Sequence, residues 1–416
     1  MSDIPPEVIN DILYRLPVKS LLRFRCVSKS FKALIDSPKF IRAHLKQQAL
    51  KHNSDVKLIF KSHKLYSLDF SSISSSQLEE LDHPLKHPYG PTQVLGSCHG
   101  LILISNNLSD NGVWNPSTKM FRKLPVCHVN PPQNHGPRQV AGLSQICGGF
   151  GYDISANDYK VVKIAQFCHF SGSSLVIVTM VFSLKLGLWK KKVQDCPYWL
   201  VKEDNGTFAA GALHWLASTE SSSEWSPWVL IGLNLGSERF KLVPYPENLG
   251  KPLHLNLAVL GECLCLISGH VVVRTNEKNH VLDHVDIWVM KDYGVKESWI
   301  KLFSVEQLDG RQHFSFLRPI AYSVTGKEVL LEMDNRKFLW YSLEKKSLKH
   351  SKINGGLDFF ESFVNLGTLV PLYGGGNDGG ENEKDEKEKI EPEKKDGAGN
   401  IEDEDVLVIE EFKLEL

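Results

Sequence analysis

The apolar residues near the start of the chain recur with helical spacing. One predicted helix places five of them on one side: Val8, Ile9, Ile12, Leu13 and Leu16. Pro17 should end this helix, because proline lacks the backbone N–H that a helix interior needs. The pattern predicts a second short helix over residues 19–25, a third capped by Ser28, and a fourth that begins at Ser37 and Pro38.

These four helices carry more apolar residues than they can bury. Of the 42 residues from 4 to 45, 21 are apolar. A module of about 40 residues has too small an interior to cover so many without a metal, a disulfide or a partner. We therefore expect an exposed apolar face, which is typical of an interface. The alternative is that the helices pack as a cap on the region that follows.

Residues 55–372 contain many short apolar segments separated by polar turns. A repeated unit joins an apolar strand, a short polar turn, and a second strand in which a bulky residue lies beside basic ones. Five segments carry this unit: 113–123, 181–191, 232–242, 287–302 and 340–350. We expect the bulky residues of these segments in the cores of the repeats: Phe121, Trp189, Phe240, Trp299 and Leu348.

A second repeated element is a glycine that leads into an apolar strand, as at Gly100, Gly211, Gly261 and Gly326. Together the two elements predict units of about 50 residues with four strands each, which is the spacing of propeller blades. Five units are clear, and pairing of residues 58–70 with 364–372 would add a sixth and close the ring. The predicted fold is a small all-α module followed by an all-β, propeller-like domain of about six blades.

Charge separates the end of the chain from the rest. The whole chain has a net charge of −1, but residues 374–416 hold 16 acidic residues and 6 lysines, which leaves +9 on the remainder. With few apolar residues, this segment is expected to be a disordered acidic tail, although Val406–Leu416 is apolar enough to dock. We therefore expect three regions, at 1–48, 55–372 and 373–416.

The eight cysteines make up under 2% of the chain and form no CxxC pair. This excludes a disulfide framework and a cysteine-based zinc site. Residues 1–20 lack a signal-peptide pattern, and no apolar run approaches the ~20 residues that span a bilayer. We expect a protein of the cytoplasm, the nucleus or both, in which the sequons at Asn107 and Asn205 carry no glycan.

The first 45 residues resemble an F-box, and in detail a plant F-box. The resemblance is carried by Ile4-Pro5, Glu7, Ile12-Leu13, Leu16-Pro17, Ser20-Leu21-Leu22-Arg23, Cys26-Val27-Ser28-Lys29, Phe31 and Pro38-Lys39-Phe40. Ile4 and Phe31 stand where the family usually has leucine and tryptophan. Residues 95–345 resemble the plant F-box-associated interaction domain in the phrases SCHGLILI, VWNPSTKMFRKLP, GFGYDISANDYKVVKI, GALHWLA and VDIWVMKDYGVKESWIKLF.

The resemblance implies a substrate receptor of an SCF-type cullin–RING ubiquitin ligase. In that family the F-box binds a Skp-family adaptor, which links it to the cullin and the RING subunit, and the second domain captures a protein substrate. The adaptor-binding residues implied here are Pro5, Val8, Ile12, Leu16, Pro17, Leu21, Leu22, Val27 and Phe31. No membrane and no nucleic acid is expected as a partner.

We find no motif for catalysis. The sequence lacks a phosphate-binding loop, a serine-hydrolase elbow, a zinc-protease helix and a calcium loop. Cys98 and His99 are expected on one strand, where neighbours point to opposite faces and cannot pair. Cys263 with Cys265, and His214 with Trp215, are expected to be core pairs. We thus predict no catalytic residue, no cofactor and no metal.

Two other functions remain as alternatives. A propeller enzyme would need carboxylates that converge on one mouth, and the sequence shows none. A nucleic-acid or scaffold protein would fit the +9 charge, but the basic residues are spread out rather than striped. The substrate-binding residues are not identified. Two long loops, Val126–Leu143 and Glu220–Trp228, are candidates because propellers bind with loops at one mouth.

Overall fold

The protein is described by a computed structural model. It describes residues 5–50, 55–70, 73, 77–86, 90–106, 110–130, 140–169, 175–195, 198–200, 205–219, 228–250, 254–271, 282–306, 314–351 and 357–372. Contacts divide the chain into residues 1–372 and 373–416, and the second unit, with the predicted tail and Val406–Leu416, lies outside the described residues. In the described part of the chain, no helix is long and apolar enough to cross a membrane.

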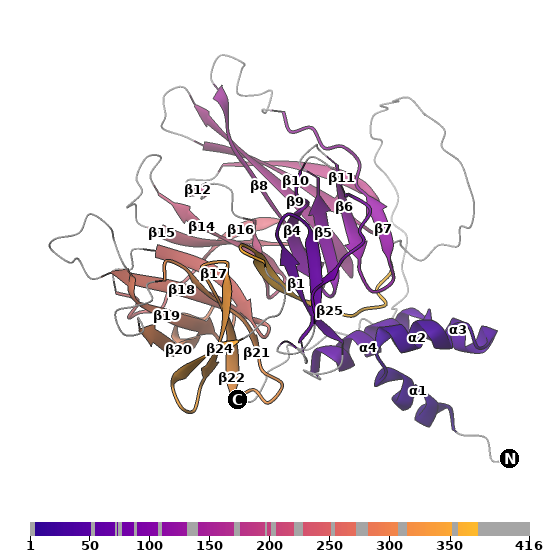
Figure 1. The fold of residues 1–416 in the computed structure, drawn as a ribbon. Helices are drawn as coiled ribbons and strands as arrows, with labels where there is room; N and C mark the ends of the chain where they lie inside the picture. The colour runs from indigo at the N-terminus through magenta and orange to yellow at the C-terminus, as the bar shows by residue number, and fades with distance from the viewer. Residues whose placement is uncertain are drawn as a thin grey trace, which may run out of the picture. The chain divides into compact units, whose positions relative to one another are not determined.

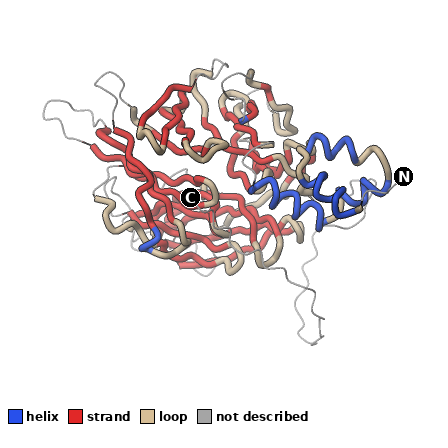
Figure 2. The backbone as a smooth tube through the Cα atoms, turned by 90° about the horizontal axis from the view of Figure 1, so that it is seen from below, coloured by secondary structure: helices blue, strands red, loops and turns tan. Residues whose placement is uncertain are grey.

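Four helices form at the N-terminus, as predicted (Figures 1 and 2). They are α1 (Pro6–Tyr14), α2 (Val18–Phe24), α3 (Lys29–Ile35) and α4 (Pro38–Leu50). Ser28 caps α3 by accepting a hydrogen bond from the N–H of Phe31 at 3.1 Å. The first helix ends earlier than its apolar stripe suggests, so Leu16 lies in the turn. The residue before a proline disfavours helical geometry, and Pro17 instead becomes the N-cap of α2.

Six antiparallel sheets follow, and they are the blades of a propeller (Figure 1). Blade 1 consists of β25 (Glu361–Leu366), β1 (Val56–Lys61), β2 (Leu65–Asp69) and β3 (Glu79–Glu80). Blade 2 consists of β4 (Gln93–Cys98), β5 (Leu101–Ser105), β6 (Asn111–Asn115) and β7 (Met120–Lys123). Blade 3 consists of β8 (Val140–Asp153), β9 (Asp158–His169), β10 (Leu175–Ser183) and β11 (Leu188–Asp195). Blade 4 contains β12 (Trp199–Leu200), β13 (Thr207–Ala209), β14 (Ala212–Ser218), β15 (Trp228–Asn234) and β16 (Arg239–Val243).

Blade 5 consists of β17 (His254–Leu260), β18 (Cys263–Val271), β19 (Leu282–Met290) and β20 (Trp299–Glu306), with the short 3-10 helix η3 (Lys296–Ser298) before its last strand. Blade 6 consists of β21 (Leu317–Tyr322), β22 (Glu328–Met333), β23 (Lys337–Ser342) and β24 (Ser347–Ser351). The first strands contact one another from blade to blade, in the pairs β4–β8, β8–β13, β13–β17, β17–β21 and β21–β25. These strands therefore surround the centre of the ring, and the six-bladed fold confirms the prediction.

The ring closes within blade 1. Strand β25 pairs with β1, with Val364 opposite Leu58, so the innermost strand comes from one end of the domain and the other three come from the opposite end. This closure was predicted from the apolar pattern. Gly100 makes it possible for the β4–β5 turn to approach β25. Its φ is +80°, and a Cβ at this position would lie 2.1 Å from the Leu366 carbonyl oxygen.

Apolar side chains fill the spaces between neighbouring blades. Trp299 is buried between blades 4 and 5, while Phe121, Trp189, Phe240 and Leu348 are half-buried against similar cores. Two of these anchors also make a polar link to the preceding blade. The indole N–H of Trp189 donates to the Pro125 carbonyl at 3.0 Å, and that of Trp299 donates to the Pro244 carbonyl at 2.8 Å. The predicted anchor positions thus join blades together.

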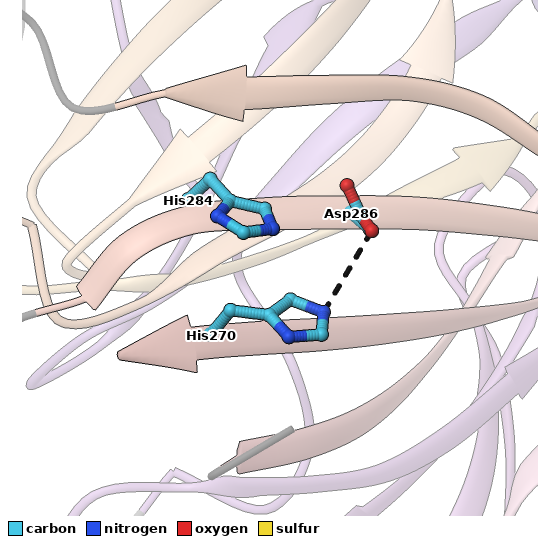
Figure 3. A group of neighbouring side chains, drawn as sticks. All are labelled: His270, His284 and Asp286. Atoms are coloured by element: carbon cyan, nitrogen blue, oxygen red, sulfur yellow. Dashed lines mark ion pairs between the residues drawn. The ribbon is translucent and has the colours of Figure 1, made fainter. Parts of the chain in front are cut away.

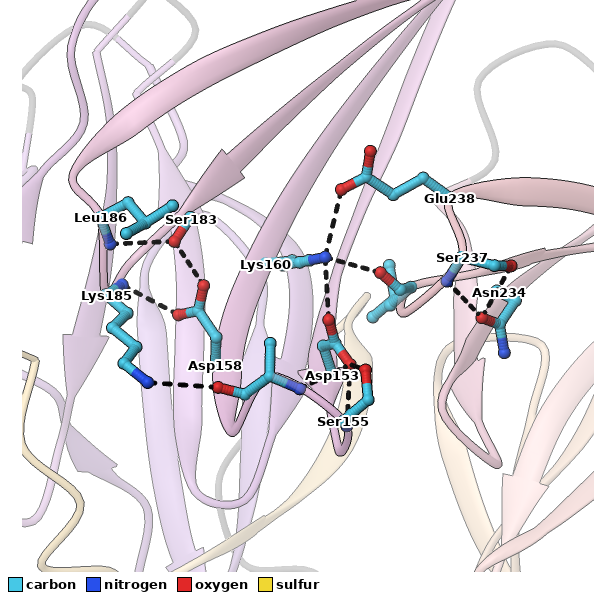
Figure 4. Close-up of polar contacts among 12 residues, drawn as sticks. Asp153, Ser155, Asp158, Lys160, Ser183, Lys185, Leu186, Asn234, Ser237 and Glu238 are labelled. Atoms are coloured by element: carbon cyan, nitrogen blue, oxygen red, sulfur yellow. Dashed lines mark hydrogen bonds and ion pairs between the residues drawn. The ribbon is translucent and has the colours of Figure 1, made fainter. Parts of the chain in front are cut away.

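A polar network joins the turns of blades 3 and 4 (Figure 4). The buried Lys160 ammonium lies 2.9 Å from Asp153, 3.1 Å from Glu238 and 2.7 Å from the Leu235 carbonyl oxygen. Asp153 also accepts from the Ser155 N–H at 2.9 Å and so shapes the β8–β9 turn. Asp153 and Lys160 both belong to blade 3, so the contacts that join blade 3 to blade 4 are those of Lys160 with Glu238 and with the Leu235 carbonyl oxygen.

Candidate functional site

Four large apolar side chains of the helical module are exposed. Val8 and Ile12 on α1 are 48% and 50% exposed, Phe24 at the end of α2 is 38% exposed, and Val27 in the following turn is 66% exposed. Val8 and Ile12 are four residues apart and lie on the same side of the helix. We call these four residues the exposed apolar set. The helical module thus leaves apolar side chains exposed, as its composition predicts.

The nine residues predicted to bind an adaptor fall into three groups. The exposed ones are Pro5, Val8, Ile12 and Val27. The half-buried ones, at the edge of the helical core or beside it, are Leu16, Pro17, Leu22 and Phe31. Leu21 is fully buried in that core with Leu13, Val18, Ile35 and Phe40. Leu21 therefore supports the surface from within and does not reach it. Phe24, the last residue of α2, is also exposed and was not among the nine residues predicted.

A buried histidine stabilises the turn that holds Leu16. The Nε2 atom of His44 on α4 lies 2.9 Å from the Leu16 carbonyl oxygen. Burial lowers the pKa of His44, so the ring is neutral and donates this hydrogen bond. The turn that separates α1 from α2 is thus held by α4.

The helical module is also fixed to the propeller. Pro17 offers no side-chain cap to α2, and the cap comes instead from Asp55, whose carboxylate accepts from the Val18 N–H at 2.7 Å. Burial is the larger influence on Asp55 and raises its pKa, although the hydrogen bond acts in the opposite direction. Leu369, which follows β25, is buried in the helical core. The alternative that the helices cap the β region therefore holds for this side of the module, while the exposed apolar set stays free of it.

The Cys98–His99 pair has no catalytic geometry. His99 lies in the β4–β5 turn with φ +48° rather than on a strand, which corrects the expectation. Its Nδ1 atom lies 3.1 Å from the Tyr159 hydroxyl. Burial lowers the pKa of His99 to about 4 and raises the pKa of the Cys98 thiol well above its usual value. The neutral forms of both groups are favoured, so a thiolate–imidazolium pair does not form.

The other singled-out pairs lie in blade cores. Cys265 is fully buried and Cys263 packs against the same core between blades 5 and 6. His214 bridges two blades, because its Nε2 lies 2.7 Å from the Tyr293 hydroxyl. Burial lowers the pKa of His214 to about 4. Trp215 is buried beside it, and the prediction of a core pair is confirmed.

The two predicted substrate loops lie largely outside the described residues, but the strands fix where they begin and end. In each blade, the first and third strands end at the same side of the ring, as at the turns Cys98–Leu101 and Asn115–Met120. Residues after β25 emerge there too, because the Asn115 amide donates to the Thr368 carbonyl at 3.1 Å. We call this side the helix end, since Leu369 contacts the helices there.

The opposite side, which we call the loop end, carries the connections after the second and fourth strands. The loops 126–143 and 220–228 are both such connections, so both start and finish at the loop end. One group of polar side chains there was missed by the sequence analysis. His270, His284 and Asp286 gather near the loop end of blade 5 (Figure 3). The available signal was the His-Val-Asp spacing on one strand, which puts His284 and Asp286 on one face.

Two known protein families match the two regions of the chain. The F-box domain family matches residues 1–43, and the F-box associated beta propeller domain family matches residues 54–368. The chain therefore belongs to the F-box proteins that carry an F-box associated beta propeller domain.

Curated relatives share this organisation over most of their length. The chain is similar to the F-box protein CPR1 of Arabidopsis thaliana, with 33% identity over 387 residues that cover 89% of each protein. It is also similar to an F-box/kelch-repeat protein of Arabidopsis thaliana, with 30% identity over 79% of this chain and 85% of that protein.

Proposed function

We propose that this protein is the substrate-recognition subunit of an SCF-type cullin–RING ubiquitin ligase. The F-box binds a Skp-family adaptor, which links the chain to the cullin and the RING subunit, and the propeller holds a protein substrate. The observation that carries the proposal is the exposed apolar set on an F-box module that is otherwise well packed. Exposed apolar residues on a folded module are typical of a surface that a partner covers.

The F-box helices also carry exposed charged residues of both signs. Glu7 and Asp11 on α1 and Lys19, Arg23, Lys29 and Lys32 on α2 and α3 are all exposed. An apolar centre with a charged rim is the usual anatomy of a protein interface. Such a rim steers association and makes the association rate depend on salt.

The contacts between the F-box and the propeller support a receptor that works without chemistry of its own. Asp55 and Leu369 hold the helices at the helix end of the propeller, and the Arg122 guanidinium reaches the Leu372 carbonyl at 3.1 Å. A substrate at the loop end would then be held at a set position relative to the adaptor. Holding a substrate lysine near a charged ubiquitin carrier raises its effective concentration. In this role the protein acts in the cytoplasm, the nucleus or both, needs no cofactor, and leaves catalysis to other subunits.

The test uses residues whose truncation leaves the fold intact. Val8→Ala with Ile12→Ala should weaken binding of a purified Skp-family adaptor by at least about tenfold, because truncation of central apolar anchors commonly costs ~2 kcal/mol or more. The matched control is Leu242→Ala with Ile300→Ala, two propeller residues that are 57% and 40% exposed. Calorimetry should give the wild-type affinity for the control. Equal affinity for both double variants would refute the assignment of the adaptor surface.

A further inference from the structure

Three potential metal ligands share one face of blade 5 (Figure 3). In the strand register His270 lies directly opposite His284, and Asp286 lies opposite Ser268. Directly opposed residues, and residues two apart on a strand, point to the same side of a sheet. The imidazole of His270 and the carboxylate of Asp286 approach to 3.7 Å, and one ligand atom from each of the three residues lies within 4.8 Å of the others. The backbone pairing itself therefore brings the three together.

From this arrangement we propose that His270, His284 and Asp286 bind a divalent transition metal of the Zn²⁺ class. Two imidazoles and one carboxylate are a ligand set that zinc accepts, whereas Mg²⁺ and Ca²⁺ prefer oxygen alone. Zinc at about 2.1 Å from each atom places its ligands roughly 3.4 Å apart. The two half-buried imidazoles now stack with their centroids 4.5 Å apart, and binding of the metal would require them to rotate so that their nitrogens converge on it. Three protein ligands leave the fourth position to water or to a donor from a bound molecule.

The side chains around the group orient it as metal sites are usually oriented. The Nδ1 atom of His284 lies 3.0 Å from the Asp283 carboxylate, and a hydrogen bond there leaves Nε2 free to bind a metal. The Ser304 hydroxyl donates to Oδ1 of Asp286, so that Oδ2 faces His270. Carboxylate partners of ligating histidines and hydrogen-bonded ligating carboxylates are the outer contacts that tune metal affinity.

The surroundings leave the group both supported and accessible. Asp286 is buried, while His270 and His284 are half-buried at the loop end of blade 5. The same sheet face continues into the apolar core shared with blade 4, where Trp288 and Met290 lie. The group thus lies beside an apolar core and is still accessible to an ion from solvent. Both are features of a binding site, whereas a fully buried group would be inaccessible.

One side chain competes with the metal. The Lys301 ammonium lies 3.1 Å from Oδ2 of Asp286 and is itself half exposed to solvent. In the absence of metal this lysine balances the buried carboxylate. A bound dication would displace it, and the Lys301 ammonium already lies near the Trp288 ring at 5.5 Å from its centroid. Because of this competition, removal of the Lys301 charge should tighten metal binding.

The experiment measures Zn²⁺ itself on the purified full-length protein. After removal of metal with a chelator, the protein is titrated with Zn²⁺ in competition with a chromophoric chelator. We expect one equivalent to bind, with affinity at least about tenfold lower in His284→Ala and in Asp286→Asn, and higher in Lys301→Met. The matched control is His254→Ala, which removes an exposed histidine from the same blade, on the opposite sheet face because it pairs with Gly269.

A second readout separates loss of the site from loss of the fold. Saturating Zn²⁺ should raise the melting temperature of the wild type and of His254→Ala, because a ligand that binds the folded state stabilises it. It should not raise that of His284→Ala, whose melting temperature without metal should match the wild type. The proposal is overturned if the titration gives the same affinity for the wild type and for a His270→Ala, His284→Ala double variant. It is equally overturned if Lys301→Met fails to bind Zn²⁺ more tightly, because Asp286 would then be no ligand.

Discussion

The two folded regions of the protein cover their apolar residues in different ways. Each blade of the propeller lies between two other blades, so both faces of its sheet are buried, as Ile287 and Trp288 show by facing opposite neighbours in blade 5. The propeller covers the F-box helices on one side only. On that side Leu369 packs into the helical core, and α4 packs against a core between two blades. Val8 and Ile12 remain exposed because none of the described elements covers that side of α1. The comparison teaches that exposure in the F-box is a property of its architecture, while the exposed apolar residues of the described propeller lie on outer strands, turns and connections.

The largest effect should come from opening the ring. Deletion of residues 358–416 removes β25, the innermost strand of blade 1, and leaves the inner edge of β1 unpaired. An unpaired apolar edge invites aggregation, and the buried Phe360, Leu369 and Leu372 are lost as well. We expect no folded monomer by size-exclusion chromatography and circular dichroism. A soluble, cooperatively folding product would show that the propeller does not depend on its closure.

A smaller effect should separate the inside of the F-box from its surface. Leu21→Ala creates a cavity at a fully buried position and should destabilise the F-box helices by about 2–5 kcal/mol. Val27→Ala, at a position 66% exposed, should change stability by no more than about 0.5 kcal/mol. Hydrogen exchange of the α2 and α3 amides measures both. Equal loss of protection in the two variants would contradict the division between core and surface.

Acid should destabilise the propeller through its buried histidines. Burial lowers the pKa of His83, His99 and His214 to about 4, against about 6.5 for an unfolded histidine. Between these values the unfolded chain binds more protons, so stability is present above pH 6.5 and is lost as the pH falls toward 4. Urea unfolding at several pH values measures this slope, which His214→Gln should make shallower. An unchanged slope in the variant would show that His214 is not buried in its neutral form.

The smallest effect should come from the tail. Removal of residues 373–416 should shift the melting temperature of the adaptor complex by less than about 2 °C, because this acidic segment has too few apolar residues to join a blade. A drop of many degrees would show that Val406–Leu416 docks on the body. Differential scanning fluorimetry of the two purified complexes is sufficient.

Features set by neighbouring residues were predictable, and features set by distant ones were not. The Ser28 cap, the four helices and the repeated hairpins follow from local spacing, and even the closure of blade 1 could be inferred because Leu58 and Val364 lie in apolar strands left without partners. By contrast, the cap of α2 comes from Asp55, which is 37 residues away, and the sequence near Val18 does not indicate it.

The same difference between local and distant determinants applies to the functional residues. The exposure of Val8 and Ile12 follows from an apolar stripe too wide for a small core. The burial of Leu21 depends on how four short helices pack, which spacing alone does not determine. The His270–His284 pair depends on strand register across the connection of residues 272–281, and a shift of one residue would separate the two side chains.

The position of Leu369 has a consequence for synthesis of the chain. The F-box is made first, but its core is completed by a residue that leaves the ribosome only after all six blades have been translated. The strand that precedes this residue is also the one that closes the ring. A chain that stops early therefore lacks both the last strand of the propeller and the last core residue of the docking module. Completion of the propeller ring and completion of the F-box core are in this way one event in the synthesis of the chain.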